Sequence, residues 1–188
     1  MGKLNDFKAT ISLKEGHSVK YFNPRPVPLA QRDKVETELN RLVKLGILSP
    51  VTYSDWATPI VVVPKSDGTV RVVGDYSVTV NPEINIEYFP MPRAEDVFAE
   101  LAGCNVFSKI DLTDAFLQME LDESAKPILT ITTHKGLFQW NRMPLGLASS
   151  PGIFQKRMEQ ILSGIPRTKI FIDDCLAAGI GSYCMISI

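Results

Sequence analysis

The segment KIFIDDCLAAG, residues 169–179, places Asp173 and Asp174 side by side between two stretches that read as short strands. Two like charges about 4 Å apart repel by roughly 4 kcal/mol at an effective dielectric constant of 20, so the pair is unfavourable unless a positive partner lies nearby. A plain hairpin tip would also explain the pair, because aspartate tolerates turn backbone and accepts hydrogen bonds from nearby amides. Taken alone, the pair favours the plain turn.

The composition is that of one globular unit. The chain has 188 residues, 45% of them hydrophobic, which is ample for a buried core. A formal net charge of −1 argues against a protein that holds nucleic acid by bulk positive charge. Three unevenly spaced cysteines without a CxxC pair support neither a zinc site nor a disulfide framework. The sequence has no signal-peptide pattern and no apolar run of membrane-spanning length, which predicts an intracellular protein without a membrane partner.

The N-terminal half begins with an arm and a helix. The proline-dense stretch YFNPRPVP, residues 21–28, predicts extended backbone. Apolar residues at helical spacing then predict a helix that ends near Gly46, and these residues are Val35, Leu39, Leu42 and Leu45.

A β-hairpin follows this helix. Two β-rich runs, residues 60–63 and 69–73, are joined by a turn that contains Asp67 and Gly68. The basic residues Lys65 and Arg71 flank the tip of this predicted hairpin.

The second half alternates short helices and strands. We expect a short helix over residues 94–101, a strand over 106–110 that ends at Asp111, a helical turn at TDAFLQ, and strands over 128–132 and 136–141. A later helix is expected to be capped by Ser150 and opened by Pro151, to end at Gly164, and to bury one apolar stripe formed by Phe154, Met158, Ile161 and Leu162. Because the elements show no regular βαβ rhythm, the predicted class is α+β with an antiparallel sheet.

Three carboxylates are expected to converge in this fold. Asp111 ends one predicted strand, and Asp173 with Asp174 lies at the tip of a hairpin that could pair beside it. Oxygen ligands without His or Cys favour Mg²⁺, which accepts one or two carboxylates together with waters and substrate phosphates. Two such ions about 4 Å apart stabilise both the attacking and the leaving oxygen in phosphoryl transfer. The positive partner of the aspartate pair would then be metal.

Several motifs in register resemble the reverse transcriptase domain of retrotransposons and retroviruses, most closely that of gypsy-like long-terminal-repeat elements. FSKIDLTDAF, residues 107–116, resembles the first catalytic motif, and FIDD, residues 171–174, resembles the YxDD box. PLGLASSPGIFQ, residues 144–155, is similar to the nucleotide-binding motif, and VPKSDGTVRVVGDY, residues 63–76, to the fingers hairpin. The resemblance covers roughly residues 8 to 179 in the order and spacing of the family.

The resemblance implies a two-metal active site. Asp111 and Asp173 would be the metal ligands, and Asp174 would complete the catalytic, metal-binding set in a supporting role. The expected cofactor is a pair of Mg²⁺ ions, with Mn²⁺ as an alternative.

The resemblance also implies a nucleotide-binding site. Phe116 would be a steric gate beneath the sugar that leaves no room for a 2′-hydroxyl, and Lys65 and Arg71 would hold the triphosphate. Without the motifs around them, Phe116 would read as a core aromatic and the two basic residues as solvated surface charges.

Three further residues are expected to line the base and sugar. They are Leu112, Leu145 and Gly146, the last because a missing side chain permits close approach. Elsewhere such a glycine is most often only part of a turn. The chain departs from the family pattern at Phe171, where Tyr is usual, at Leu145, where Phe or Gln is more common, and at Ser77, where a basic residue is common.

The expected architecture is the fingers and palm of a right-handed polymerase with an antiparallel palm sheet. Residues 1–27 would form an extended N-terminal arm, 28–92 mainly fingers, 93–179 mainly palm, and 180–188 a divergent tail. Only 14 residues follow Asp174, and IGSYCMISI, residues 180–188, does not resemble the continuation of the family, so we expect the primer-grip hairpin, thumb, connection and RNase H regions to be absent.

The function implied is RNA-directed DNA polymerisation as part of a retrotransposon pol polyprotein. A primer 3′-hydroxyl would attack the α-phosphate of a deoxynucleoside triphosphate on an RNA or DNA template, and pyrophosphate would leave. The alternative is a truncated, inactive remnant retained as a nucleic-acid or protein binding module. An RNA-templated RNA polymerase is disfavoured by Phe116, since such an enzyme must admit the 2′-hydroxyl.

Overall fold

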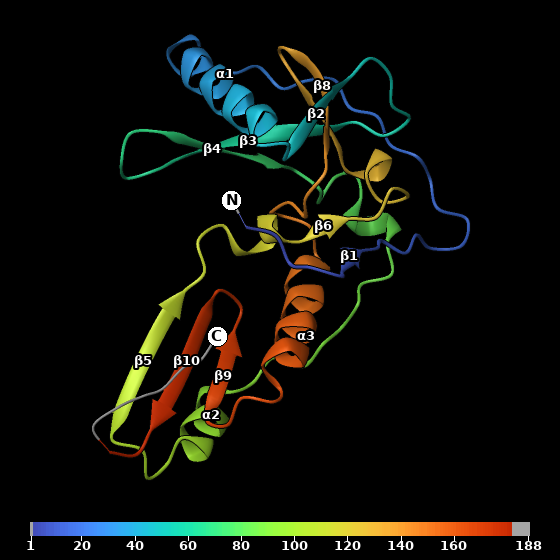
Figure 1. Ribbon diagram of the computed structural model, residues 1–188. Coiled ribbons are helices and arrows are strands. Elements are labelled where there is room, and N and C mark those ends of the chain that lie inside the picture. Colours follow the sequence, from blue (N-terminus) through green and yellow to red (C-terminus); the bar gives the residue numbers. More distant parts are fainter. Residues whose placement is uncertain (1, 182–188) are drawn as a thin grey trace. The chain divides into compact units, whose positions relative to one another are not determined.

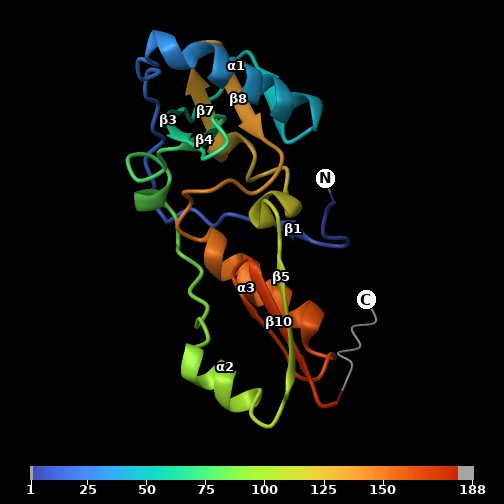
Figure 2. The ribbon, with the colours of Figure 1, turned by 90° about the vertical axis from the view of Figure 1, so that its left-hand side faces the viewer.

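The computed structural model describes residues 2–181 and divides into two compact units (Figures 1 and 2). The first unit comprises Met1–Ile86 and Phe116–Ser150, and the second comprises Glu87–Ala115 and Pro151–Ile188. The predicted tail, residues 180–188, lies almost wholly outside the described residues.

A five-stranded sheet covered by one helix forms most of the first unit. Its strands run in the order β2 (Leu48–Val51), β8 (Gly136–Trp140), β7 (Thr130–Thr133), β3 (Thr58–Pro64) and β4 (Val70–Gly74). Helix α1 (Leu29–Lys44) packs against β2 and β4 and buries Val35, Leu39 and Leu42. The predicted hairpin is therefore β3–β4. The sheet is mixed, because β3 and β7 pair in parallel, which sequence patterns did not predict.

The predicted end of α1 at Gly46 is confirmed. Gly46 has a φ of 69°, in the left-handed region that suits glycine after a helix. The amide of Ile47 donates to the carbonyl of Leu42 at 2.9 Å, and that of Gly46 donates to the carbonyl of Val43 at 2.9 Å. These bonds satisfy carbonyls that would otherwise be left unpaired at the helix end.

Smaller elements complete the first unit. Strands β1 (Lys8–Ala9) and β6 (Glu120–Leu121) pair in parallel. The described residues also include the 3₁₀ turns η1 (Asn81–Glu83), η2 (Ala115–Gln118) and η3 (Pro127–Leu129). The strand predicted to begin at residue 128 is wrong in its first two residues, which belong to η3. The reason is Pro127, whose fixed φ suits the first position of a helical turn.

The second unit is a three-stranded antiparallel sheet with two helices. The strand order is β5 (Val106–Asp111), β10 (Asp174–Gly179) and β9 (Thr168–Phe171). Helix α2 (Ala94–Glu100) packs Val97 and Leu101 against Ala178 of β10. Helix α3 (Ser150–Leu162) lies beside β9, where the side chain of Gln155 donates to the carbonyl of Ile170 (Figure 1).

Two predictions about α3 are wrong in detail. Ser150 is the first helical residue rather than the cap, and its hydroxyl donates to the carbonyl of Pro144 at 3.0 Å. The predicted apolar stripe also ends early, because Ile161 is 44% exposed. Burial shifts instead to Ile153 and Gln155, since the side chain of Gln155 turns inward to bond the backbone of β9.

Close packing between α3 and the preceding extended segment requires a glycine. A Cβ at the buried Gly152 would lie 2.4 Å from the carbonyl oxygen of Glu87. Because this oxygen belongs to the backbone, the clash could be relieved only by moving the main chain. We expect Gly152→Ala to lower the free energy of unfolding by roughly 1–3 kcal/mol, as overpacking does. Gly164→Ala, where a Cβ meets nothing within 4 Å, is the matched control and should change the thermal midpoint little. Equal midpoints for both variants would contradict this account of the packing.

Candidate functional site

The three aspartates meet at one end of the antiparallel sheet. Asp111 ends β5 directly opposite Asp174, the first residue of β10. Asp173 lies in the turn just before, and its carbonyl accepts a hydrogen bond from the amide of Leu112 at 2.8 Å. The predicted pairing of the Asp173–Asp174 hairpin beside the strand of Asp111 is therefore confirmed.

A lysine on the same face contacts these carboxylates. Burial alternates along β5, so Lys109 and Asp111 both point to the exposed face. The Nζ atom of Lys109 lies 2.9 Å from Oδ2 of Asp174, its diagonal neighbour on β10. The hydrogen bond to Asp174 raises the pKa of Lys109, and attraction to Asp111 and Asp173 adds to the shift. The spacing two residues before Asp111 places Lys109 on the same face, but sequence reasoning missed its contact with Asp174 because that contact depends on the register of β5 and β10.

The carboxylates do not form a closed metal cage. Within residues 2–181, no group of three or more His, Cys, Asp or Glu side chains is arranged to hold a metal ion by itself. The donor chemistry of Asp111 and Asp173 nevertheless suits Mg²⁺, which binds through one or two carboxylates and takes its other ligands from water and phosphate. The residues therefore fit Mg²⁺ as a partial ligand set.

The predicted triphosphate residues lie on the β3–β4 hairpin of the first unit. Arg71 is exposed on the face opposite the buried Val70 and Val72. Lys65 begins the tip, where its amide donates to the carbonyl of Thr69 at 2.9 Å. Asp67 fixes the tip by accepting from the amide and hydroxyl of Thr69 at 2.9 and 2.6 Å.

Gly146 approaches the base of the same hairpin. It has a φ of 91°, and a Cβ there would lie 2.9 Å from the carbonyl oxygen of Gly74 and 3.2 Å from Cγ1 of Val73. Val73 is on the same strand face as Arg71, two residues away. A glycine is therefore required at position 146 by both conformation and space.

Asn81 brackets the loop that contains Gly146. Its Nδ2 donates to the carbonyl of Gly146 at 3.1 Å, and its Oδ1 accepts from the amide of Ala148 at 2.9 Å. Sequence reasoning missed this residue because its partners are backbone groups far along the chain. No local pattern at position 81 signals them.

The remaining predicted residues are divided between the two units. Phe116 and Leu145 belong to the first unit and Leu112 to the second, and all three side chains are half-buried. Phe116 lies within η2, and its carbonyl accepts a hydrogen bond from the amide of Met119 at 3.0 Å. The structure thus groups Lys65, Arg71, Phe116, Leu145 and Gly146 in one unit and Asp111, Leu112, Asp173 and Asp174 in the other.

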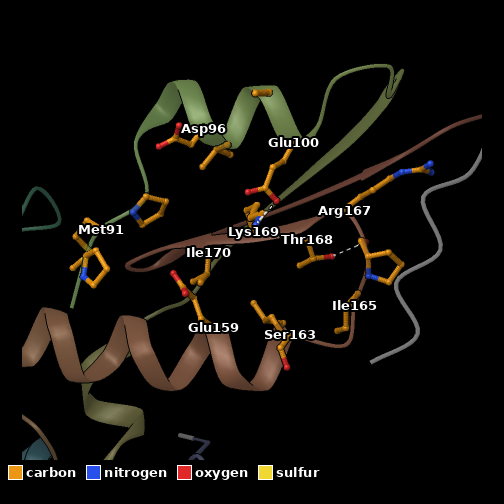
Figure 3. A pocket seen from close by; sticks show the side chains of 16 residues that line it. Met91, Asp96, Glu100, Glu159, Ser163, Ile165, Arg167, Thr168, Lys169 and Ile170 are labelled. Carbon is orange, nitrogen blue, oxygen red and sulfur yellow. Dashed lines mark hydrogen bonds and ion pairs between the residues drawn. The ribbon is translucent and has the colours of Figure 1, made fainter.

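A cavity of about 900 Å³ lies in the second unit, lined by α2, β9 and the end of α3 (Figure 3). An ion pair between Lys169 and Glu100 spans it. None of the three aspartates lines this cavity.

Across the part of the chain that the structure describes, no helix is both long and apolar enough to cross a membrane.

The profile of one protein family, described as "Reverse transcriptase (RNA-dependent DNA polymerase)", matches residues 34–182. The protein named "Uncharacterized protein K02A2.6" from Caenorhabditis elegans is 40% identical over 178 residues, which are 94% of this chain and 14% of that protein. "Retrovirus-related Pol polyprotein from transposon 412" from Drosophila melanogaster is 30% identical over 190 residues, covering 97% of this chain and 15% of that protein. The chain thus spans about one seventh of these relatives.

Solved structures agree in fold. The foamy viral protease-reverse transcriptase in complex with dsDNA matches with a TM-score of 0.78 and 23% identity, over 91% of this chain and 37% of that chain. The same kind of enzyme in complex with an RNA/DNA hybrid matches with a TM-score of 0.76 and 24% identity, over 85% of this chain and 21% of that chain. The fold is therefore the mixed α+β fold of a polymerase. With the family profile covering most of its length, this chain belongs to the reverse transcriptase family.

Proposed function

We propose that this chain carries the nucleotidyl-transfer site of an RNA-directed DNA polymerase. One observation carries the proposal: Asp111 ends β5 directly opposite Asp174, beside the turn that holds Asp173, in a member of the reverse transcriptase family. The reaction adds a deoxynucleotide to a primer 3′-hydroxyl with loss of pyrophosphate. The proposed partners are an RNA or DNA template with its primer and deoxynucleoside triphosphates.

Asp111 and Asp173 are proposed to bind Mg²⁺, and Asp174 to support them. Bound divalent ions would supply charge stabilisation at the attacking and leaving oxygens. Lys109 neutralises part of the carboxylate charge through its contact with Asp174. Because the described carboxylates do not form a group of three ligands, metal affinity should be weak until nucleotide phosphates add their oxygens.

The residues of the first unit are proposed to bind the nucleotide. Arg71 and Lys65 supply positive charge for the triphosphate, the first as a planar bidentate donor and the second as a point charge. Gly146 leaves backbone accessible where a side chain cannot fit. Phe116 is the proposed sugar gate, and Leu145 supplies apolar contacts. Leu112, which belongs to the second unit, is proposed as a further apolar contact.

We also propose a division of the sequence into fingers and palm, which differs from the two compact units because Phe116–Ser150 belongs to the first unit. We propose residues 1–27 as an N-terminal arm, 28–92 as mainly fingers, and 93–179 as mainly palm, with the antiparallel sheet of β5, β10 and β9 as the palm sheet. We also propose that this chain contains no thumb. Holding the primer in register would then depend on segments outside it.

A non-catalytic binding module is the second candidate function. One observation favours it: the ion pair from Lys109 to Asp174, which engages one of the three carboxylates of the proposed site. The two candidates differ in whether the chain supports nucleotide addition when the primer is held in place.

Primer extension separates the candidates. A labelled DNA primer on an RNA template is incubated with Mg²⁺ and deoxynucleotides, using the chain alone and the chain joined to the thumb of a related reverse transcriptase. We expect the chain alone to add few nucleotides and to lose binding steeply as salt rises, because its net charge is −1. Misplacing the reacting groups by 1 Å can cost on the order of 100-fold, so the thumb should restore addition.

The control for this assay is the joined protein with EDTA in place of Mg²⁺. Absence of addition by the joined protein under all salt conditions would support the binding module instead.

A further inference from the structure

We propose that Gln155 is a positioning residue for Asp173, because its side chain holds the hairpin turn that carries Asp173 in a left-handed backbone conformation at Ile172. The effect of this clamp on catalysis rests on the proposed polymerase function. The clamp itself rests only on contacts within the second unit.

The two-residue turn between β9 and β10 has a backbone conformation that is unfavourable for its sequence. Phe171 and Asp174 are paired across the ladder, so Ile172 and Asp173 alone form the connection. Ile172 has a φ of 54°, while Asp173 does not have a positive φ. When the first of two turn residues has a positive φ, that position is normally occupied by glycine. A β-branched residue is unfavourable there, so surrounding contacts must hold it in place.

Gln155 supplies contacts on both sides of the turn. Its side chain comes from α3 and is fully buried, at 0% exposure. The Oε1 atom accepts from the amide of Ile172 at 2.9 Å, and Nε2 donates to the carbonyl of Ile170 at 2.8 Å. Nε2 also donates to Glu159 on the next turn of α3 at 2.8 Å. One amide side chain therefore satisfies backbone groups before and within the strained turn.

The other side of the turn is tied to the strand of Asp111. The amide of Leu112 donates to the carbonyl of Asp173 at 2.8 Å. Asp173 thus lies between two anchors, Gln155 on α3 and Leu112 after β5. If the anchor on α3 is lost, the turn can relax toward an ordinary φ at Ile172, and the carboxylate of Asp173 moves relative to Asp111.

Two substitutions at Gln155 separate the bond that its side chain accepts from the two that it donates. Gln155→Leu keeps the approximate volume but removes all three bonds, which leaves buried backbone groups unpaired. Gln155→Glu keeps an acceptor for the amide of Ile172 but loses the donors to Ile170 and Glu159, and it places a second carboxylate beside Glu159. The matched control is Gln160→Leu, the same change at an exposed position of the same helix.

The first readout is hydrogen exchange of the Leu112 amide, followed by NMR in the 188-residue chain. We expect Gln155→Leu to speed this exchange about tenfold or more, because the turn that accepts the bond becomes mobile. Adding Ile172→Gly should slow it again, since glycine adopts the positive φ without help. Gln160→Leu should leave it unchanged. If Gln155→Leu prevents folding, the same comparison is made with Gln155→Met, whose unbranched side chain also lacks the acceptor for the amide of Ile172.

The second readout is single-nucleotide addition by the chain joined to a related thumb. We expect Gln155→Leu to lower kcat on the order of 100-fold with a small change in KM for the deoxynucleotide, and Ile172→Gly to recover at least tenfold of the loss. A residue needed only for packing would not be rescued by glycine at position 172. Failure of rescue in both readouts would overturn the proposal.

The two readouts also distinguish this inference from the proposed function. If the joined protein with native Gln155 adds no nucleotide but the exchange results hold, the clamp stands and the polymerase function fails. If exchange at Leu112 is unchanged in Gln155→Leu, the clamp fails whatever the activity.

Discussion

Replacing Asp111 and Asp173 together by Asn should abolish nucleotide addition by the chain joined to a thumb, with a loss on the order of 1,000-fold or more. The two carboxylates are the proposed metal ligands, and metal stabilisation of the reacting oxygens is worth several kcal/mol, where each 1.36 kcal/mol is tenfold in rate. The measurement is single-turnover addition of one deoxynucleotide at saturating primer-template. Asp33→Asn, at an exposed position of α1, is the matched control and should keep its rate.

The same double variant should be slightly more stable than the native chain when no metal is present. Asp111 lies directly opposite Asp174, and like charges in that position destabilise a strand pair. Lys109 remains paired with Asp174 after the substitution, and the loss of its weaker attractions to Asp111 and Asp173 keeps the expected gain small. A small rise in the thermal midpoint together with lost activity is the expected signature. A lower midpoint would mean that the aspartates stabilise the fold and are not a site held against repulsion.

The charges at this site illustrate how far sequence reasoning reaches. The repulsion between Asp173 and Asp174 predicted a positive partner, which was expected to be metal. The structure shows Lys109 in contact with Asp174, and the metal stays a prediction. The face of β5 follows from simple alternation once the strand is recognised. The identity of the diagonal neighbour depends on strand register, which is set by the whole sheet and not by local spacing.

Long-range pairings and inward-turned polar groups were the main features that the sequence did not predict. The hairpin of β3 and β4, the strand ending at Asp111 and the end of α1 at Gly46 all follow from local patterns, and the structure confirms them. The parallel pairing of β3 with β7 joins segments far apart in the chain and has no local signal. The burial of Gln155 was not predicted, because a glutamine next to an apolar stripe is normally expected to face solvent. Its side-chain amide is instead buried against β9.

Phe116→Val should leave use of deoxynucleotides within a few-fold of native while raising incorporation of ribonucleotides on the order of 100-fold. The proposed gate acts by excluding the 2′-hydroxyl, and shape differences of one or two groups in a pocket are worth about 10- to 200-fold in specificity. Phe116 is half-buried within η2, so shortening it removes a ring from a partly open position and leaves the core largely filled. The measurement compares kcat/KM for deoxycytidine and cytidine triphosphates in the joined protein.

Phe98→Val is the control for this comparison, because Phe98 is an equally large ring with 68% exposure on α2 and has no proposed contact with nucleotide. Its discrimination between the two triphosphates should equal the native value. If Phe116→Val also discriminates as the native protein does, Phe116 is an ordinary packing residue, and the main argument against an RNA-polymerising relative is lost with it. If Phe116→Val admits ribonucleotides while its thermal midpoint stays close to native, the selectivity for deoxynucleotides lies in this one ring. A general loosening of the first unit would instead lower both the stability of the protein and its use of deoxynucleotides.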